Sequence, residues 1–297
     1  MINKKLIMGI AIILFLISLF SIVLPFFNSQ TKKTESKGTI TLATPSWTGS
    51  TIKTHVVKNV LEDIGYNTEI KNLDVGIIYN QLAEGKVDIF VESWLPTTHA
   101  EYLEEYNNSL NKINVNLDET FAGLTVPEYV YNEGIHSITD LKNKSEEFGD
   151  TILCIGAGDG MTLNTEEAIE KYNLTGFECK TSSTSAMLAQ VERFLNKDEW
   201  FVNLAWEPHY MFFEFPLKKL DDPIKAYGGQ EELVYTITRN GFERDYPEAA
   251  EFLKAFEVTT EDQNNWIYSY AKKEIEPNKI AEDWIKNNSD RVNNWLG

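Results

Sequence analysis

The sequence predicts a two-lobed α/β fold in which each lobe is a mainly parallel sheet flanked by helices. Short segments rich in Val, Ile and Phe alternate with segments whose apolar residues recur at helical spacing. This alternation runs through the chain twice, once before about residue 124 and once after it. The last part of the chain adds one more strand and then only helices, so we expect it to return to the first lobe. The predicted lobes are residues 39–124 together with 234–297, and residues 125–233.

The first lobe begins with strands and helices in alternation. Its strands are expected at residues 38–45, 67–73 and 86–93, and its helices at residues 50–66 and 76–85. Apolar residues in the longer helix recur three and four positions apart, and a glycine ends it.

The second lobe repeats this pattern. Strands are expected at residues 151–158, 177–183 and 199–206, and helices at residues 165–174 and 186–197. The two units are of similar size, which is why we expect two lobes with a cleft between them.

The tail starts with a strand at residues 231–241 and continues as helices. If it returns to the first lobe, the chain crosses between the lobes twice, near residues 124–126 and 231–234. The tail helices carry three tryptophans that we expect to serve packing alone: Trp266, Trp284 and Trp295.

The N-terminal segment is strongly apolar. Residues 6–27 form an uncharged run of 22 residues, preceded by two lysines. Such a run is long enough to cross a bilayer, and its positive flank should stay in the cytoplasm. We therefore expect residues 1–27 to be an uncleaved membrane anchor, with a removed signal peptide as the alternative. Residues 28–38 are polar and indicate a flexible tether, so the folded, extracytoplasmic part begins near Thr39.

The net charge restricts the possible partners. A formal charge of −18 offers no basic surface to neutralise phosphates, which argues against nucleic acid as a partner. It also argues against broad contact with anionic lipid. A small cationic or zwitterionic ligand remains compatible with this charge.

No motif for catalysis or metal binding is present. The histidines and cysteines lack metal-ligand spacing, and no nucleophile can be combined with a base and an orienting group. We expect no cofactor. His55 and His209 are expected to be ordinary surface histidines. Cys154 and Cys179 are expected to be two buried thiols, with a disulfide bridge as the alternative.

Three further tryptophans each follow a predicted strand at its C-terminal end: Trp47, Trp94 and Trp206. In a two-lobed α/β protein, such strand ends face the ligand cleft. Indole faces attract a cation that cannot donate hydrogen bonds, such as a quaternary ammonium, by up to about 2 kcal/mol per ring when desolvated. Each tryptophan alone is more typical of a core residue, but their shared position predicts an aromatic box.

A glycine-rich loop precedes the first helix of the second lobe. Gly156, Gly158 and Gly160 leave a strand and lead into that helix, whose N-terminus can bind an anion. The spacing fits neither a P-loop nor a dinucleotide site, so a single carboxylate is the expected anion, with a simple tight turn as the alternative. His99, five residues after Trp94, can hold a carboxylate as a neutral N–H donor or when protonated.

Several motifs in consistent order resemble the substrate-binding proteins of glycine betaine ABC transporters used in osmoprotection. The resemblance runs from about Thr39 to about Lys254 and rests on "PSWTGSTIKTHVVKNVLEDIGY", "LAEGKVDIFVESWLPTTH", "IGAGDGMT", "AWEPHYMF" and "YPEAAEFLKAF". It implies a hinged, two-lobed fold of the periplasmic-binding-protein type II class, which closes over its ligand.

The resemblance also implies roles for individual residues. The trimethylammonium group of the ligand is expected in a box of three rings, those of Trp47, Trp94 and Trp206. Backbone amides of Gly160 and Met161, with the side chain of His99, are expected to hold the ligand carboxylate. Asp159 lies next to these amides in the sequence and would then have to point away from the site.

The sequence therefore predicts a non-enzymatic receptor, anchored to the membrane on its extracytoplasmic side, that captures glycine betaine and delivers it to an ABC permease. Proline betaine is a second expected ligand. The alternatives are a receptor for another quaternary amine, such as carnitine or choline, and a receptor coupled to a sensor. An exported enzyme acting on a quaternary amine is disfavoured because no catalytic group accompanies the glycine loop.

Overall fold

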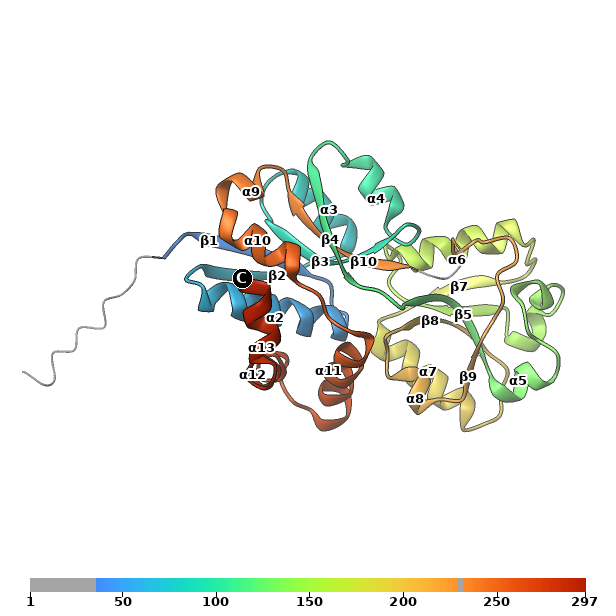
Figure 1. The fold of residues 1–297 in the computed structure, drawn as a ribbon. Helices are drawn as coiled ribbons and strands as arrows, with labels where there is room; N and C mark the ends of the chain where they lie inside the picture. Colours follow the sequence, from blue (N-terminus) through green and yellow to red (C-terminus); the bar gives the residue numbers. More distant parts are fainter. Residues whose placement is uncertain (1–35, 229–231) are drawn as a thin grey trace, which may run out of the picture. The chain divides into compact units, whose positions relative to one another are not determined.

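The computed structural model describes residues 36–228 and 232–297, and Gly38–Gly297 form one compact unit. The predicted membrane segment at residues 6–27 and most of the predicted tether lie outside the described residues. Within the two described ranges, no helix is both long enough and apolar enough to span a membrane. Two separate sheets divide the compact unit into two lobes (Figure 1).

The first lobe contains a five-stranded sheet in the order β2-β1-β3-β10-β4. Its strands are β1 (Thr39–Thr44), β2 (Asn67–Asn72), β3 (Ile89–Leu95), β4 (Leu110–Leu117) and β10 (Leu233–Arg239). β1 pairs in parallel with β2 and β3, whereas β10 pairs antiparallel with β3 and β4. Because β10 comes from the end of the chain, the tail lies with the first lobe (Figure 1).

The second lobe contains a sheet in the order β7-β6-β8-β5-β9. Its strands are β5 (Phe121–Pro127), β6 (Thr151–Cys154), β7 (Glu178–Thr181), β8 (Val202–Glu207) and β9 (Leu217–Lys219). β6 pairs in parallel with β7 and β8, whereas β5 pairs antiparallel with β8 and β9. The crossover that we expect near residues 124–126 falls inside β5, so the chain already belongs to the second sheet there.

Both sheets are mixed, and the prediction of mainly parallel sheets is wrong. Strand and helix alternation identified the parallel strands, but β4, β5 and β9 lie outside that alternation. Only residues 118–120 separate β4 from β5, which leaves no room for a crossover helix. A strand that continues directly from the other lobe enters its sheet from the cleft side, where the parallel strands end, and therefore runs antiparallel to them.

Helices pack on both faces of the first sheet, as the alternation predicts. The helices before the crossover are α2 (Thr48–Asp63), α3 (Val75–Ala83) and α4 (Ala100–Glu105). Successive strand residues point to opposite faces. Leu42 and Ile89 accordingly share one core cluster with the apolar residues of α2, whereas Ala43 and Phe90 share another with those of α3.

The remaining helices cover the second sheet and complete the first lobe. Those of the second lobe are α5 (Glu128–Asn132), α6 (Gly160–Lys171), α7 (Thr184–Leu195) and α8 (Met211–Glu214), with 3-10 turns at Ile138–Leu141 and Ser145–Phe148. Those of the tail are α9 (Phe242–Asp245), α10 (Pro247–Ala255), α11 (Thr260–Lys273), α12 (Pro277–Asn287) and α13 (Ser289–Leu296). α11 and α12 pack against α2, and α10 packs against β4 and α13.

The tail tryptophans are packing residues, as predicted. Trp266 and Trp295 are buried, and Trp284 packs between them. The Trp284 ring meets the Trp266 ring edge-on at 5.3 Å and stacks on the Trp295 ring at 5.7 Å between centroids. These rings join α11, α12 and α13 to one another.

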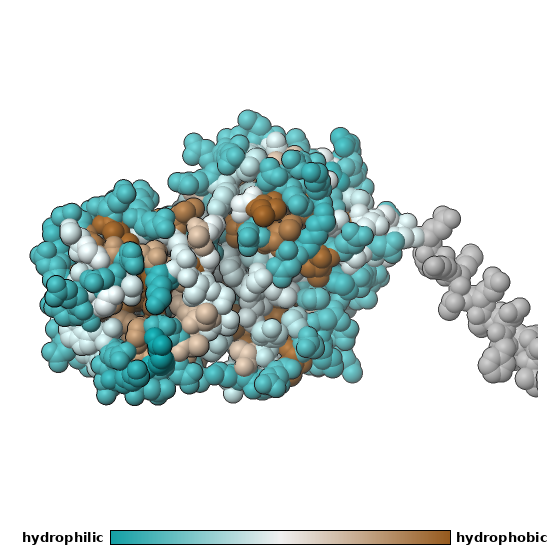
Figure 2. Space-filling model, turned by 180° about the vertical axis from the view of Figure 1, so that it is seen from behind, coloured by the Kyte–Doolittle hydropathy of each residue, from teal (hydrophilic) through white to brown (hydrophobic). Residues whose placement is uncertain are grey.

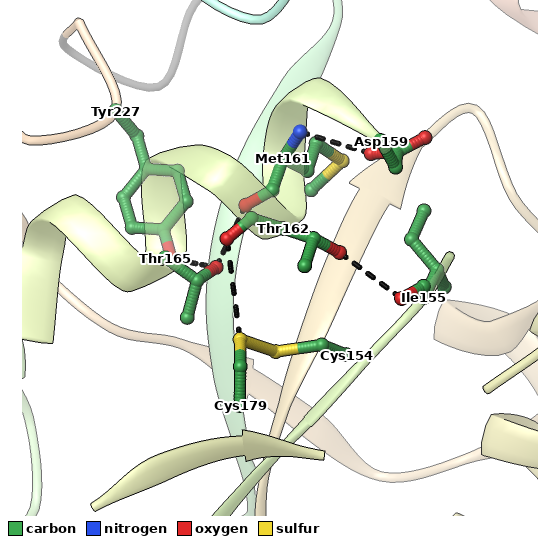
Figure 3. Close-up of a disulfide and its surroundings, with 8 residues drawn as sticks. All are labelled: Cys154, Ile155, Asp159, Met161, Thr162, Thr165, Cys179 and Tyr227. Carbon is green, nitrogen blue, oxygen red and sulfur yellow. Dashed lines mark hydrogen bonds between the residues drawn. A yellow bond between two sulfur atoms is a disulfide. The ribbon is translucent and has the colours of Figure 1, made fainter. Parts of the chain in front are cut away.

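Cys154 and Cys179 form a disulfide, so the prediction of two free thiols is wrong and the alternative holds (Figure 3). Cys154 ends β6 and Cys179 lies in the neighbouring strand β7, where the two residues are close enough to be bridged. Strand pairing, which sequence spacing alone does not reveal, brings the two sulfur atoms together. The bridge lies directly before the glycine-rich loop.

Figure 2 shows one face of the molecule, which is mostly hydrophilic with small, separate hydrophobic areas. This agrees with the high content of acidic residues in the chain. The face therefore presents no broad apolar surface of the kind that marks a large permanent interface.

Candidate functional site

Trp47, Trp94 and Trp206 line one cavity between the two lobes. Trp47 lies between β1 and α2, Trp94 is the next-to-last residue of β3, and Trp206 is the next-to-last residue of β8. Trp94 and Trp206 are buried, and Trp47 is half-buried. The first lobe therefore contributes two indole rings and the second lobe contributes one.

The cavity is narrow and mostly apolar. It encloses about 30 Å³, which is room for about two water molecules. Its walls come from both lobes, so a relative movement of the lobes changes its size.

Trp94 is held at its indole nitrogen by a buried polar cluster that the sequence analysis did not identify. Its indole Nε1 donates to Oε1 of Glu92 at 3.3 Å, and Glu92 also lines the cavity. The other carboxylate oxygen of Glu92 lies 2.8 Å from the ammonium of Lys53, which is fully buried. Gln263 of α11 donates to Glu92 Oε1 at 3.2 Å. Burial lowers the pKa of Lys53, and the adjacent Glu92 carboxylate opposes this shift.

His99 is buried beside the aromatic residues and is held in one tautomer. Its Nδ1 accepts the backbone N–H of Trp94 at 3.0 Å, so the proton of the neutral ring lies on Nε2. Among the described residues, no hydrogen-bond partner is within reach of Nε2. Burial lowers the pKa of His99 to about 3. Of the two forms considered from the sequence, the neutral N–H donor is therefore the one present, and its ring stacks on Trp47 at 5.9 Å.

Gly160 and Met161 form the first turn of α6, where the second lobe meets the first. A Cβ added to Gly160 would lie 1.8 Å from the carbonyl oxygen of Thr98, so only glycine permits this approach. Met161 lines the cavity, and its backbone N–H donates to Oδ1 of Asp159 at 2.9 Å (Figure 3).

Asp159 does not point away from the site, and the expectation that it would is wrong. Its side chain is 7 % exposed, caps the N-terminus of α6 and lines the same cavity as the three tryptophans. Burial raises the pKa of Asp159 to about 7, although the backbone N–H groups of Met161 and Thr162 oppose the shift. An aspartate is a common N-cap, but only the tertiary structure places this one in the cavity.

His209 is not a surface residue, and the prediction for it is wrong. It is buried, and its ring meets the Trp206 ring edge-on at 4.9 Å between centroids. Its Nδ1 accepts the backbone N–H of Met211 at 3.1 Å, and burial lowers its pKa to about 3. It therefore supports Trp206 from the side of the second lobe.

Four other cavity residues lie in the quoted motifs but were given no role from the sequence: Gly49, Ser50, Ile155 and Pro208. Gln263 and Ile267 come from α11, which carries no local signal for binding. One available signal was overlooked: both buried tryptophans of the cavity occur in the pattern W-x-P, and both Leu95–Pro96 and Glu207–Pro208 are cis peptide bonds. The contribution of α11, by contrast, requires the tail to fold back onto the first lobe.

A larger and more polar cavity adjoins the first one. It encloses about 680 Å³ and is lined by residues 156–159, residues 182–185 and the side of Trp47. His209, Tyr210 and Tyr270 are among its other lining residues. Because Trp47 and Asp159 line both cavities, the larger one provides a polar approach to the aromatic rings.

Two polar contacts join the lobes on either side of these cavities. The hydroxyl of Tyr102 in α4 donates to the carbonyl oxygen of Gly158 at 2.8 Å. The ammonium of Lys272 in α11 lies 2.8 Å from the carboxylate of Glu214 in α8. In the described part of the chain, no group of three or more His, Cys, Asp or Glu residues could hold a metal ion.

Comparisons with known proteins agree with this geometry. The family model described as the substrate-binding domain of the ABC-type glycine betaine transport system matches residues 38–287. The glycine betaine/carnitine transport binding protein GbuC of Listeria monocytogenes is 37% identical over 156 residues, which are 52% of this chain and 51% of that protein. The chain thus aligns with about half the length of this relative.

Two solved structures are similar along most of the chain. The glycine betaine/L-proline-binding protein ProX of Borrelia burgdorferi is 32% identical, with a TM-score of 0.83 over 87% of this chain and 97% of that chain. An ABC-transporter choline-binding protein in complex with choline is 28% identical, with a TM-score of 0.82 over 87% of this chain and 91% of that chain. The predicted two-lobed type II fold is confirmed by these likenesses.

Proposed function

The chain belongs to the family of substrate-binding domains of ABC-type glycine betaine transport systems, and on this premise we propose that it captures glycine betaine and delivers it to an ABC permease for osmoprotection. Members of the family bind and present substrates, so the chain is a binding protein and not an enzyme. The observation that carries the ligand class, a quaternary ammonium compound, is the convergence of three indole rings from two lobes on one cavity.

The aromatic rings suit the cationic end of the ligand. A quaternary ammonium has diffuse charge and methyl groups that cannot donate strong hydrogen bonds, so a carboxylate alone does not select it over Lys or Na⁺, whereas aromatic rings do. Three desolvated rings, at up to about 2 kcal/mol each, supply a large part of the roughly −8 kcal/mol of a micromolar complex.

A candidate donor for the carboxylate end of the ligand is Nε2–H of His99, which is buried beside Trp47 and has no partner among the described residues. His99 is fully buried and lines neither cavity, so a ligand carboxylate reaches it only after the surrounding rings move. The amide of Met161 faces the cavity region as well, but Asp159 accepts its hydrogen. Proline betaine, with the same pair of charged groups, is the second carboxylate ligand.

Choline is a second candidate because of two observations. Asp159 places a carboxyl group in the cavity, where it can accept the hydroxyl hydrogen of a quaternary ammonium alcohol. The chain is also similar along most of its length to a protein solved with choline. The alternative of carnitine rests on the likeness to a glycine betaine/carnitine binding protein.

We propose hinge closure as the mechanism of capture. Trp47 and Trp94 belong to one lobe and Trp206 to the other, so a ligand between them contacts all three rings only when the lobes are close. Such a ligand binds the closed state preferentially and shifts the population toward it. A closed lobe pair then presents one surface to the permease.

We further propose that residues 6–27 anchor the protein to the membrane, with the binding domain on the extracytoplasmic side. The support is the length of this uncharged run and the two lysines before it. Fractionation of cells tests this: the full-length protein should stay with the membrane after carbonate extraction. Release of a shortened protein would indicate a removed signal peptide instead.

Calorimetric titration of the full-length protein and of a Trp94→Ala variant tests the proposed ligand class. We expect glycine betaine to bind the wild type, and the dissociation constant to rise at least tenfold in the variant, because a desolvated ring contributes up to about 2 kcal/mol. Trp295→Phe is the control, since Trp295 is equally buried but packs among the tail helices. An unchanged dissociation constant for glycine betaine in Trp94→Ala would contradict the assignment of the aromatic box.

A further inference from the structure

Asp159 places a carboxyl group at the helix end where the ligand carboxylate is expected. Its Oδ1 accepts the N–H of Met161 at 2.9 Å, and the N–H of Thr162 also hydrogen-bonds to it (Figure 3). The neighbouring Gly160 is packed against the carbonyl oxygen of Thr98. Two amide donors at the start of α6, those of Met161 and Thr162, are therefore already used by a residue of the protein.

A ligand carboxylate that reaches this position comes close to the carboxylate of Asp159. Two ionised carboxylates in one desolvated site repel each other, so one of them takes up a proton. A protonated Asp159 keeps Oδ1 as acceptor for Met161 and gains an Oδ2–H donor for the ligand carboxylate. Burial raises the pKa of Asp159 to about 7, so this proton is accessible near neutral pH.

For a ligand without a carboxylate, the ionised form of Asp159 is the favourable one. The ionised Asp159 then provides a nearby negative charge for the quaternary nitrogen and an acceptor for a hydroxyl group. Protonation of Asp159 removes both contributions. The same side chain thus favours one ligand class in its neutral form and the other in its ionised form.

We propose that Asp159 makes ligand choice dependent on pH: a quaternary ammonium carboxylate binds together with one proton taken up by Asp159, whereas a quaternary ammonium alcohol binds the ionised carboxylate. This inference rests on the proposed binding of quaternary ammonium ligands and specifies the role of one residue in that site. The proton comes from solvent and is released again when the ligand leaves.

Other titratable groups surround Asp159 and have to be separated from it. Those that line the two cavities or interact electrostatically with it are Asp74, Glu92, Tyr102, His209, Tyr210 and Tyr270. The pKa of His209 is lowered to about 3 and that of Tyr102 is raised, both mainly by burial, so neither ring changes charge near pH 7. Glu92 is paired with Lys53.

Glu232 is the strongest competing source of a pH effect. Its carboxylate accepts the N–H and the hydroxyl of Thr98, both at 2.8 Å, and Thr98 lines the cavity and faces Gly160. Burial raises the pKa of Glu232 to about 7 as well. A Glu232→Gln variant is therefore the matched control for Asp159→Asn.

The test is calorimetric titration of the full-length protein with glycine betaine and with choline between pH 5.5 and 8.5. At each pH the titration is repeated in two buffers with different ionisation enthalpies. The difference between the two binding heats gives the number of protons taken up. For glycine betaine we expect a dissociation constant that rises about tenfold per pH unit above pH 7.5, with uptake approaching one proton. For choline we expect affinity to increase from pH 5.5 to 7.5 and then to level off.

Asp159→Asn should remove both trends, because the amide oxygen still accepts the Met161 N–H but the side chain cannot ionise. Glycine betaine binding should then be independent of pH, and choline should bind as weakly as it does to the wild type at pH 5.5. Glu232→Gln should keep the trends of the wild type.

Three results would overturn the inference. The first is tight glycine betaine binding at pH 8.5 without proton uptake in the wild type, a measurement that needs no variant. The second is a pH dependence that survives in Asp159→Asn and disappears in Glu232→Gln. In both cases the aromatic box and the proposed function still stand. The third is the absence of detectable binding of both ligands at every pH, which would overturn the proposed function as well.

Discussion

Lys53 and Glu92 form an ion pair next to the indole nitrogen of Trp94. Neither side chain is more than 2 % exposed, and the pair is completed by hydrogen bonds from Lys53 to Asn116 at 3.0 Å and from Gln263 to Glu92. A buried pair of this kind is tolerated when its remaining polar atoms are satisfied, and loss of one partner leaves an uncompensated charge. Through Glu92 the pair holds the indole N–H of Trp94.

We expect Lys53→Met and Glu92→Gln each to lower the free energy of unfolding by about 3 kcal/mol. Each change leaves the charge of the other residue buried without an opposite charge beside it. The double variant should lose clearly less than the sum of the two, since neither charge remains. Urea unfolding measures all three. Additive losses in the double variant would show that the two side chains act separately. Lys58→Met is the control, as its pair with Glu62 lies at the surface.

At the scale of the elements, the disulfide joins β6 and β7 at the point where β6 leads into the glycine-rich loop. Cys179 also lies next to the first turns of α6, where its sulfur is 4.0 Å from the carbonyl oxygen of Thr162 (Figure 3). The bridge therefore ties together the strand, the loop and the helix that position Asp159 and Met161.

Replacement of both cysteines by alanine should lower the free energy of unfolding by about 3 kcal/mol, because the bridge closes a loop with a sequence separation of 25 residues. Thermal unfolding with and without a reducing agent measures this. Reduction should destabilise the wild type by a similar amount and leave the double variant unchanged. A reductant effect that persists in the double variant would assign the loss to another cause.

At the scale of the whole molecule, the two lobes meet through a few specific contacts around the cavities. Thr98 of the first lobe faces Gly160 of the second, and the Tyr102 hydroxyl reaches the Gly158 carbonyl. These contacts form only when the lobes are close together, so in the proposed hinge closure they belong to the closed state. The lack of a side chain at Gly160 is a condition for that state.

Gly160→Ala should weaken ligand binding at least tenfold, because its Cβ would lie 1.8 Å from the Thr98 oxygen and 2.7 Å from the Thr98 carbonyl carbon. Gly158→Ala is the matched control in the same loop, since a Cβ there meets nothing within 4 Å. Calorimetry measures affinity, and small-angle scattering measures closure on addition of ligand. Wild-type affinity in Gly160→Ala would contradict the assigned role of this contact.

The sequence by itself determined most of the elements and the positions of the three tryptophans at strand ends. Both rest on local properties: apolar periodicity selects strand or helix within a few residues, and a strand end in such a fold faces the cleft whatever its neighbours are. The resemblance to a known family rested on the same short motifs, among them "SWLP" and "AWEP".

Only the tertiary structure decided which partners these residues meet. Glu92 and Gln263 are separated by 171 positions, and Thr98 and Glu232 by 134, so no local pattern predicts their contact. The same holds for the antiparallel strands, which enter each sheet from the other lobe, and for the pairing of Cys154 with Cys179. Asp159 was read from the sequence as a residue that turns away, but the start of α6 lies in the cavity and its cap lies there with it. Long-range packing sets the surroundings of a side chain, and those surroundings set its charge.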